Sequence, residues 1–179
     1  MGYRHSTEEI LAAAVEETMA SGWSGLTFKR VGDRLGISDR TVVYYFPTKL
    51  DLIGGVAGTL AGKLTELLES AFGSGPMNSR DLLKRAWPTL TASEADQIFV
   101  LFFEIVGLAA SRTSPFDVLA PTLVDGWVEW LVPHVLGSSL EIRRRRALAA
   151  VAQIDGLLLI RHILGSDAAN AAAHEIGIA

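Results

Sequence analysis

The chain has 179 residues, of which 49% are hydrophobic, with a formal net charge of −4 and no cysteine. That length and apolar content suffice for one large or two small folded domains and exclude an intrinsically disordered chain. Without cysteine, a disulfide framework and a thiolate metal site are excluded as well. The N-terminal segment lacks the apolar run of a signal peptide, and the most apolar stretch, Ile98 to Ala110, is too short to span a bilayer. We therefore expect a soluble cytoplasmic protein.

The first predicted helix begins with a capping box, in which Ser6 caps the helix and Glu9 reaches back to it. Ser21-Gly22 is expected to end this helix. The apolar stripe of the helix consists of Ile10, Leu11, Ala14, Val15 and Met19. Trp23 is expected to lie in the core rather than in a ligand site, because aromatic side chains dominate small cores. Thr27 is the predicted N-cap of the next helix.

A helix-turn-helix is predicted between Val31 and Ile53. Gly36 breaks the helix that starts near Thr27, and Ser38 can cap a second helix starting at about Asp39. Gly32 stands where the two helices must cross closely. On the second helix Val42 and Phe46 are spaced i, i+4 and face inward, which turns four polar side chains partly or wholly outward. These are Arg40, Thr41, Tyr44 and Tyr45, a set that suits a DNA groove.

A third helix is predicted after Pro47, which stops the recognition helix because it lacks an amide donor. Thr48 is its predicted N-cap, and Lys49 lies in its first turn. A lysine is poorly placed for the helix dipole there, since the dipole favours anions. A DNA phosphate at this helix N-terminus would account for Lys49, because it would meet the amides and the ammonium together.

Over these residues the chain resembles the TetR (tetracycline-repressor) family of transcriptional regulators. Their pattern is close to T-x-x-x-(V/I)-A-x-x-x-G-(V/I)-S-x-x-T-(L/V)-Y-x-(Y/H)-F-x-x-K-x-x-L. Here it runs from Thr27 to Leu52 through Gly36, Ile37, Ser38, Thr41, Val42, Tyr45, Phe46 and Lys49. Two positions depart from it: Gly32 replaces the usual alanine, a mild change, and Val43 replaces a tyrosine that typically contacts DNA. That tyrosine's role is not transferred to Val43.

The resemblance implies further DNA contacts and a division of the chain. Thr27 would meet a phosphate, and Lys29 stands where the family often places a basic DNA contact. For Arg30, a DNA contact and a solvated helix face are equally open. We expect a helix-turn-helix DNA-binding domain over residues 1–48 and a helical effector-binding and dimerisation domain over residues 49–179. Residues 1–50 hold six Lys or Arg and six Asp or Glu, so non-specific DNA affinity should be modest and salt-sensitive.

The rest of the chain shows helical patterns without a convincing period-two strand, which makes the predicted fold all-α. A connector helix over residues 49–72 starts at the DNA surface and can transmit a displacement. Gly73 to Ser79 is a linker. Helices follow over Asp81 to Thr91, from Ser93, from Ser114-Pro115 with interruptions at Pro121 and Pro133, and from a cap formed by Ser138 with Glu141. A short helix is predicted after Asp167.

The last long helix has two apolar rows, one of Val151, Ile154 and Leu158 and a second of Leu157, Ile160 and Leu164. A monomer would cover both with difficulty, so one row is expected to pack against a second copy. A homodimer through the C-terminal helices would then present two recognition helices to a palindromic operator in double-stranded DNA. The run Arg143 to Arg146 is interpreted as a solvated, salt-bridged helix face rather than a nucleic-acid site.

In proteins of this resemblance the large C-terminal part houses a pocket for a small-molecule effector. The candidate lining residues are Trp87, Phe99, Phe102, Phe103, Glu104, Trp127, Trp130, His134 and Arg161. The aromatic residues have a core role as the alternative, and His134 could cap its helix. Glu104 stands out because a carboxylate on an apolar helix is costly to bury without a partner. It is expected to face a ligand or to pair with Arg112 or Arg161.

The predicted function is that of a sequence-specific DNA-binding transcriptional regulator, a repressor released from its operator by an effector. Two other functions stay open. One is a helical ligand-binding or scaffolding module without DNA binding, which the Val43 departure and the neutral N-terminal domain would favour. The other is an enzyme using Glu104 and His134 with Asp155, although no nucleophile elbow, phosphate-binding glycine loop or metal-ligand histidine pair is present. We predict no enzymatic activity, no cofactor and no metal site.

Overall fold

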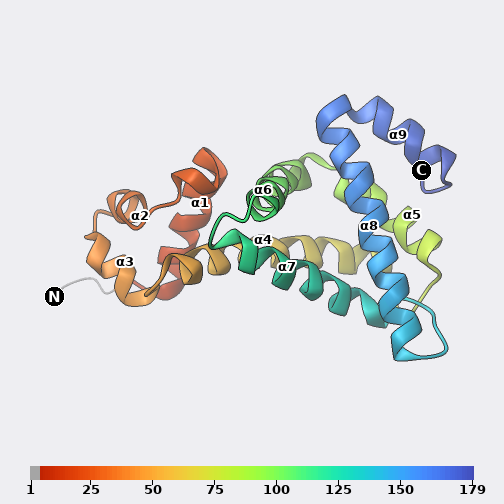
Figure 1. Cartoon of the computed structure of the whole chain (residues 1–179), viewed down its shortest axis with the longest axis horizontal. Helices are drawn as coiled ribbons and strands as arrows, with labels where there is room; N and C mark the ends of the chain where they lie inside the picture. Colours follow the sequence, from red (N-terminus) through yellow and green to blue (C-terminus); the bar gives the residue numbers. More distant parts are fainter. Residues whose placement is uncertain (1–4) are drawn as a thin grey trace. The chain divides into compact units, whose positions relative to one another are not determined.

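The computed structural model describes residues 5–179, and over these residues the chain is all-α (Figure 1). The only pairing of extended backbone among them is an isolated bridge between Met77 and Val135. The helices are α1 (Thr7–Gly25), α2 (Phe28–Leu35), α3 (Asp39–Tyr45), α4 (Lys49–Phe72), α5 (Ser79–Leu90), α6 (Ser93–Ala110), α7 (Phe116–Leu131), the short 3-10 helix η1 (Val132–His134), α8 (Leu140–Leu164) and α9 (Ser166–Glu175). The predicted fold class is confirmed.

The chain divides into two compact units. The first takes in the chain up to Lys63 together with Glu104–Leu119, and the second comprises Leu64–Phe103 and Ala120–Ala179. Helices α4, α6 and α7 therefore contribute residues to both units. The functional boundary predicted at residue 48 concerns DNA binding rather than packing, and it stays a prediction.

The core of the first unit brings α1, α2 and α3 together with the first part of α4. Its largest fully buried side chains include Trp23, Ile10 and Leu26. The edge of Trp23 meets Phe116 at a centroid distance of 6.2 Å. Trp23 is therefore a core residue, as the sequence predicts.

Local capping explains where the first helices begin. The Ser6 side chain accepts the amide of Glu9, whose carboxylate accepts the amide of Ser6, which is the predicted capping box. Thr48 and Asp51 form the same reciprocal arrangement at the start of α4. Farther along the chain the prediction is off by one residue: Ser139 rather than Ser138 caps α8, accepting the amide of Ile142. Adjacent serines are equivalent candidates in sequence, and backbone geometry chooses between them.

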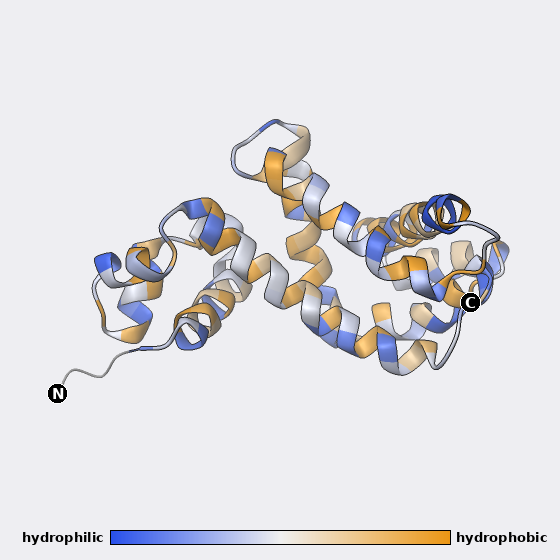
Figure 2. Cartoon of the chain, turned by 90° about the horizontal axis from the view of Figure 1, so that it is seen from below, coloured by the Kyte–Doolittle hydropathy of each residue, from blue (hydrophilic) through white to orange (hydrophobic). Residues whose placement is uncertain are grey.

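The second unit is organised around α8. Its Val151, Ile154 and Leu158 are buried, and Figure 2 shows polar and apolar residues mixed along the same helices. Both rows of α8 that the sequence proposed for a dimer contribute buried residues, because Leu157 of the second row is buried too. Leu148, Leu159, Ile163 and Leu164 form an exposed apolar stripe on α8, which includes Leu164 of the second row. Neither predicted row is therefore free along its whole length, and the packing of one row against a second copy stays a prediction.

Pro121 lies inside α7 and does not interrupt it. Proline cannot donate to the carbonyl one turn earlier, that of Asp117. Both residues are exposed, so solvent can replace the missing donor. Pro133 falls in η1, directly after α7 ends.

By length and composition, α8 is long and apolar enough to cross a membrane, and it is the one such helix in residues 5–179. Its first part carries Arg143 to Arg146. Arg144 meets Asp125 and Glu129 at 3.3 and 2.8 Å, and Arg146 donates to the carbonyl of Leu136 at 2.7 Å. With its buried row inside the second unit, α8 is a partly buried core helix. Arg144, Arg145 and Arg146 are engaged in ion pairs or hydrogen bonds, as predicted, whereas the buried Nε of Arg143 has no hydrogen-bond partner within the described residues.

Candidate nucleic-acid interface

The position of α3 is fixed by the turn before it. Gly36 ends α2 in the left-handed region, at φ 68°, and the Ser38 hydroxyl accepts the amide of Thr41 at 3.3 Å to begin α3. Gly32 is buried, and a Cβ added to it would lie 2.8 Å from the Ile37 carbonyl oxygen. The close crossing expected at Gly32 is present. The replacement of alanine by Gly32 is therefore not a mild change, since this packing leaves no room for a methyl group.

Helix α3 buries one side and exposes the other. Val42 and Phe46 are 0% and 7% exposed, as their spacing predicts. Arg40 and Tyr44 lie on the exposed side, and Tyr44 is 79% exposed. Val43 is also exposed, at 39%. The helix thus presents a guanidinium, an aromatic ring and an apolar side chain on one accessible face.

Thr41 and Tyr45 are half-buried, and their hydroxyl groups are engaged within the protein. The Thr41 hydroxyl lies 3.0 Å from the Ser38 hydroxyl. The Tyr45 hydroxyl donates to the His5 carbonyl at 2.5 Å, and its ring meets that of Tyr44 edge-on at 5.2 Å. A phosphate oxygen accepts hydrogen bonds but does not donate them. In this conformation Tyr45 cannot give its proton to a phosphate, so a DNA contact through that hydroxyl would require it to leave His5.

Three further residues predicted to contact DNA lie at helix N-termini in the first unit. Thr27 caps α2 by accepting the amide of Arg30 at 3.2 Å, which leaves its hydroxyl proton unused by the cap. Lys29 is exposed and its ammonium is 2.5 Å from the Asp33 carboxylate. Lys49 is exposed in the first turn of α4. Their contact with DNA stays a prediction.

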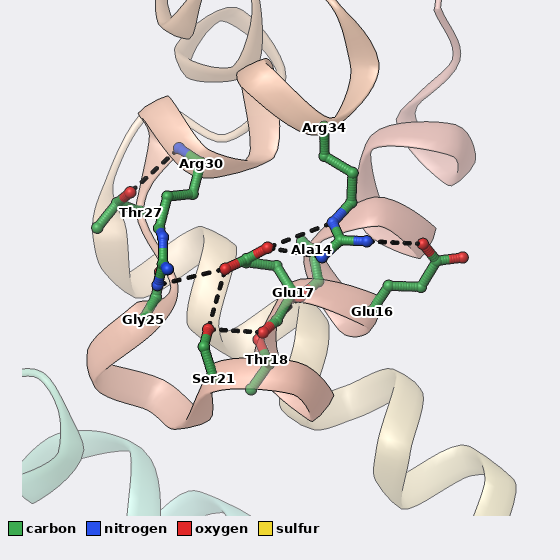
Figure 3. Close-up of polar contacts among 9 residues, drawn as sticks. All are labelled: Ala14, Glu16, Glu17, Thr18, Ser21, Gly25, Thr27, Arg30 and Arg34. Carbon is green, nitrogen blue, oxygen red and sulfur yellow. Dashed lines mark hydrogen bonds and ion pairs between the residues drawn. The ribbon is translucent and has the colours of Figure 1, made fainter.

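A buried carboxylate that the sequence did not point out lies on α1 and faces Arg30 and Arg34 of α2 (Figure 3). Glu17 of α1 is 7% exposed and accepts Arg34 at 2.7 Å and the Ser21 hydroxyl at 2.9 Å. The Arg30 guanidinium lies 3.3 Å from Oε1 of Glu17, the oxygen that Ser21 also contacts. The hydrogen bond from Arg34 is the largest cause that lowers the pKa of Glu17 below its ordinary value. This cluster holds α2 against α1.

Arg30 belongs to the Glu17 cluster rather than to a purely solvated helix face, and a DNA contact by Arg30 stays untested. Besides Glu17, its guanidinium donates to the Gly25 carbonyl at 3.3 Å, so Arg30 points back to α1 in the arrangement of Figure 3. Among the predicted DNA contacts, the cations are Lys29, Arg40 and Lys49, all exposed. A signal for Glu17 does exist in the sequence, since it lies at helical spacing from Ile10 and Ala14 on the apolar stripe of α1.

The effector candidates fall into separate groups. In the second unit, Phe99, Phe102 and Phe103 form one aromatic group, which His162 joins at 5.5 Å from Phe103. A second group contains Trp127, Trp130, His134 and Phe72, with Phe72 5.6 Å from Trp130 and 5.3 Å from His134. Trp87 is buried, and its indole donates to Asn170 at 3.2 Å. Phe72 and His162 were not among the predicted lining residues.

The two charged candidates already have partners. Glu104 accepts the backbone amide of Trp23 at 3.2 Å, so neither Arg112 nor Arg161 is its partner, contrary to the expectation. Arg161 instead donates to both oxygens of Asp96 at 3.1 Å. A backbone donor cannot be recognised from side-chain chemistry, which is why the sequence suggested an arginine.

The catalytic alternative gains no support from these positions. Glu104 belongs to the first unit and His134 to the second. Within residues 5–179 no group of His, Asp and Glu side chains could hold a metal ion.

Residues 10–56, which contain the α2–turn–α3 unit and the start of α4, match the family model described as bacterial regulatory proteins, tetR family. Over these residues the chain belongs to the TetR family. It is therefore a DNA-binding transcriptional regulator, and its family is a non-enzymatic one. No curated protein sequence matches the chain.

Solved structures with the same fold extend the likeness of this TetR-family chain beyond the matched region. One, from Rhodococcus sp. and described as a TetR-family transcriptional regulator, has a TM-score of 0.74 at 16% identity and covers 97% of this chain and 98% of its own. The multidrug binding protein EbrR, complexed with imidazole, has a TM-score of 0.71 at 19% identity, covering 99% and 92%. A transcriptional regulator from Rhodococcus sp. Rha1 has a TM-score of 0.62 at 24% identity, covering 88% and 83%. These identities carry the fold alone.

Proposed function

We propose that this TetR-family regulator is a cytoplasmic homodimeric repressor that leaves a palindromic operator when a small-molecule effector binds. The observation that supports DNA binding is the exposed face of α3. Arg40 and Tyr44 are exposed there, whereas Val42 on the opposite side is buried. A short helix held by a cap and a glycine turn, with a guanidinium outward, fits a major groove. Arg40 is assigned to base edges and Tyr44 to bases or backbone.

The phosphate contacts are assigned to Thr27, Lys29 and Lys49, with Thr41 and Tyr45 at the margin of the interface. Thr27 keeps a hydroxyl proton to donate, and Lys29 and Lys49 are exposed ammonium groups at the starts of α2 and α4. Amides and cations at helix N-termini both favour phosphate. Because each subunit makes few phosphate contacts, its affinity for DNA should depend strongly on a second copy of the chain.

The second copy is assigned to the exposed apolar stripe of α8. Leu159 and Ile163 lie one turn apart and are 42% and 66% exposed, and Leu148 is 51% exposed. The exposed Ala152 and Gly156 between them are small, so a partner helix could approach closely. A two-fold axis through this stripe would repeat α3, and half-sites of such dimers lie about 34–36 Å apart or a multiple of it.

The effector is assigned to the aromatic residues of the second unit. Two groups are available there, one around Phe102 and Phe103 and one around Trp127, Trp130 and His134. Aromatic walls with few polar groups are typical of small-molecule sites. The fold shared with a multidrug binding protein, EbrR, is compatible with an apolar or aromatic effector.

Coupling between effector and DNA is assigned to α4. Lys49 begins this helix next to the recognition helix, and Phe72 ends it inside the aromatic group of Trp130 and His134. An effector that moves those rings would displace the end of α4, and the displacement would change the separation of the two recognition helices. This is a coupling free energy between two sites, and it must be reciprocal.

The test is a binding selection followed by a competition. Duplexes selected from a random-sequence library by the purified chain are titrated against random competitor DNA, and specific binding is the expected result. Compounds that raise the melting temperature of the protein are then screened for release of the selected duplex. If effector and DNA bind the same dimer without changing each other's affinity, the proposed coupling is wrong. If no duplex binds better than random DNA, the DNA-binding assignment of α3 is wrong.

A further inference from the structure

The apolar residue on the exposed face of α3 has no function in the DNA contacts assigned so far. Val43 is 39% exposed. It follows Arg40 by three positions, which places the two side chains on the same side of the helix. Val42, which directly precedes Val43, is fully buried. Val43 is therefore presented to the groove together with Arg40 and is not part of the core.

The chemistry of Val43 and its neighbours limits the kind of DNA contact that this position can make. Thr41 and Tyr45 direct their hydroxyl groups to Ser38 and His5. Val43 itself has no polar atom, so it can neither bind a phosphate nor form a hydrogen bond with a base edge. Its branched side chain can only make apolar contact. In the major groove, the C5-methyl of thymine is the apolar group of a base pair.

We infer that Val43 is a specificity-determining residue that contacts the C5-methyl of a thymine in each half-site. This inference rests on the proposed insertion of α3 into the major groove. It assigns to Val43 a kind of contact different from that of the tyrosine for which it stands in the family pattern. A tyrosine hydroxyl can meet the DNA backbone and is tolerant of sequence, whereas contact with a methyl group selects thymine.

The spacing along α3 also locates the thymine. Three residues advance a helix by about 4.5 Å, and successive base pairs are about 3.4 Å apart along one strand. The thymine read by Val43 lies one or two base pairs from the base read by Arg40. Arginine most often takes guanine in this setting, so the half-site contains a guanine and a thymine in this close relationship.

The test removes a single methyl group from the DNA. In the selected duplex of highest affinity, each thymine is replaced in turn by deoxyuridine, which pairs identically but lacks the C5-methyl. We expect one thymine per half-site at which the replacement weakens binding about fourfold, the effect of exposing one buried methyl group. Replacement in both half-sites should weaken binding about fifteenfold if the two effects add.

The assignment to Val43 comes from repeating the titration with Val43→Ser and with Val43→Asn, neither of which carries a methyl group. Both variants should bind the thymine and deoxyuridine duplexes with nearly equal affinity. Val100→Ala, which truncates an exposed valine of α6, should keep the full fourfold difference. The deoxyuridine titrations use the unmodified protein, so their result does not depend on whether a Val43 variant folds.

The outcomes are distinguishable. Specific binding without any thymine whose methyl group matters overturns the inference and leaves the proposed function intact. A methyl effect that persists in both Val43 variants overturns it too, because another residue then makes the contact. Failure to select any duplex above random DNA overturns the proposed function and the inference that rests on it.

Discussion

The carboxylate of Glu104 accepts the backbone amide of Trp23, with its two oxygens 3.2 and 3.4 Å from the nitrogen. Gly22, at φ 71° and ψ −179°, breaks α1 just before Trp23, and an amide after such a break has no helical acceptor. The carboxylate lies 3.0 Å from the place where a Cβ on Gly22 would stand. Glycine at this position both permits the break and leaves room for the acceptor, which ties α6 to α1.

Removing this acceptor should cost stability. Glu104→Ala removes this acceptor of the Trp23 amide and is expected to lower the free energy of unfolding by about 1–3 kcal/mol. Glu104→Gln should cost less, since its amide oxygen can still accept. Urea denaturation gives both values. Glu66→Ala, which removes an exposed carboxylate from α4, is the control and should change stability little. A Glu104→Ala chain as stable as the unmodified one would show that water replaces the carboxylate without loss.

The Glu17 cluster predicts a pH-dependent stability. The pKa of Glu17 is lowered in the folded chain, chiefly by Arg34, so its ionised form adds stability above the unfolded pKa of about 4.3. That stability is lost as the pH falls through the lower folded pKa. Glu17→Gln should therefore be less stable at pH 7, by about 1–3 kcal/mol, and the difference should shrink at acid pH.

Thermal unfolding of the Glu17→Gln chain at pH 7 and pH 3 measures that difference. Glu16→Gln is the matched control, because Glu16 is exposed and meets the same arginine at 3.4 Å. An exposed pair contributes about 0–1 kcal/mol, so this control should remain close to the unmodified chain. Equal losses in the two variants would mean that burial does not strengthen the Glu17 pair.

Gly32→Ala is expected to destabilise the protein although the family pattern has alanine there. The new methyl group would lie 2.8 Å from the Ile37 carbonyl oxygen, a backbone atom that cannot move alone. Such overpacking costs about 1–3 kcal/mol, against about 1 kcal/mol gained in helix propensity. Gly58→Ala on α4 is the control, since nothing lies within 4 Å of its added Cβ. Melting temperatures should fall for Gly32→Ala and rise or stay equal for Gly58→Ala. A rise in both would mean that α2 and α3 can separate to admit the methyl group.

The predictable part of this fold is the part set by neighbours in sequence. The caps at Ser6, Thr27, Ser38 and Thr48 each act within three residues, so the first four helices could be located from sequence. Val42 and Phe46 follow from helical spacing in the same way. The resemblance to the TetR family depends on this stretch, so the fold of the N-terminal region could be predicted from sequence.

Contacts between residues distant in sequence could not be predicted. The partner of Glu104 is 81 residues away and is a backbone amide, which leaves no mark in composition. The free face of α8 depends on which other helices cover it, and both apolar rows looked suitable for a partner. For the same reason the sequence could name aromatic residues for an effector site, but it could not divide them into the groups around Phe103 and Trp130.

Asp155 provides a test of buried charge in the second unit. Burial raises its pKa to about 6, above the value near 4 of an unfolded chain. Its protonated form therefore adds stability below about pH 4, and this is lost as the pH rises through 6. Asp155→Asn should be more stable than the unmodified chain at pH 7, by of order 1–3 kcal/mol, with no advantage at pH 4. Asp125→Asn, which changes an exposed carboxylate paired with Arg144, should show no such pH-dependent gain.

Comparison of Arg40→Ala with Lys49→Ala should separate base recognition from phosphate binding. Lys49 is an exposed ammonium at the start of α4, so its loss should weaken binding to all duplexes alike. It should also lower the dependence of log affinity on log salt by about 0.9 for each phosphate contact, or about two for a dimer. Arg40→Ala should relax preference at one base of each half-site, at a cost of about 1–3 kcal/mol against the selected sequence. Titrations of the selected duplex and its single-base variants at several salt concentrations measure both effects. An unchanged sequence preference in Arg40→Ala would remove Arg40 from base recognition, and an unchanged salt slope in Lys49→Ala would remove Lys49 from the phosphate contacts.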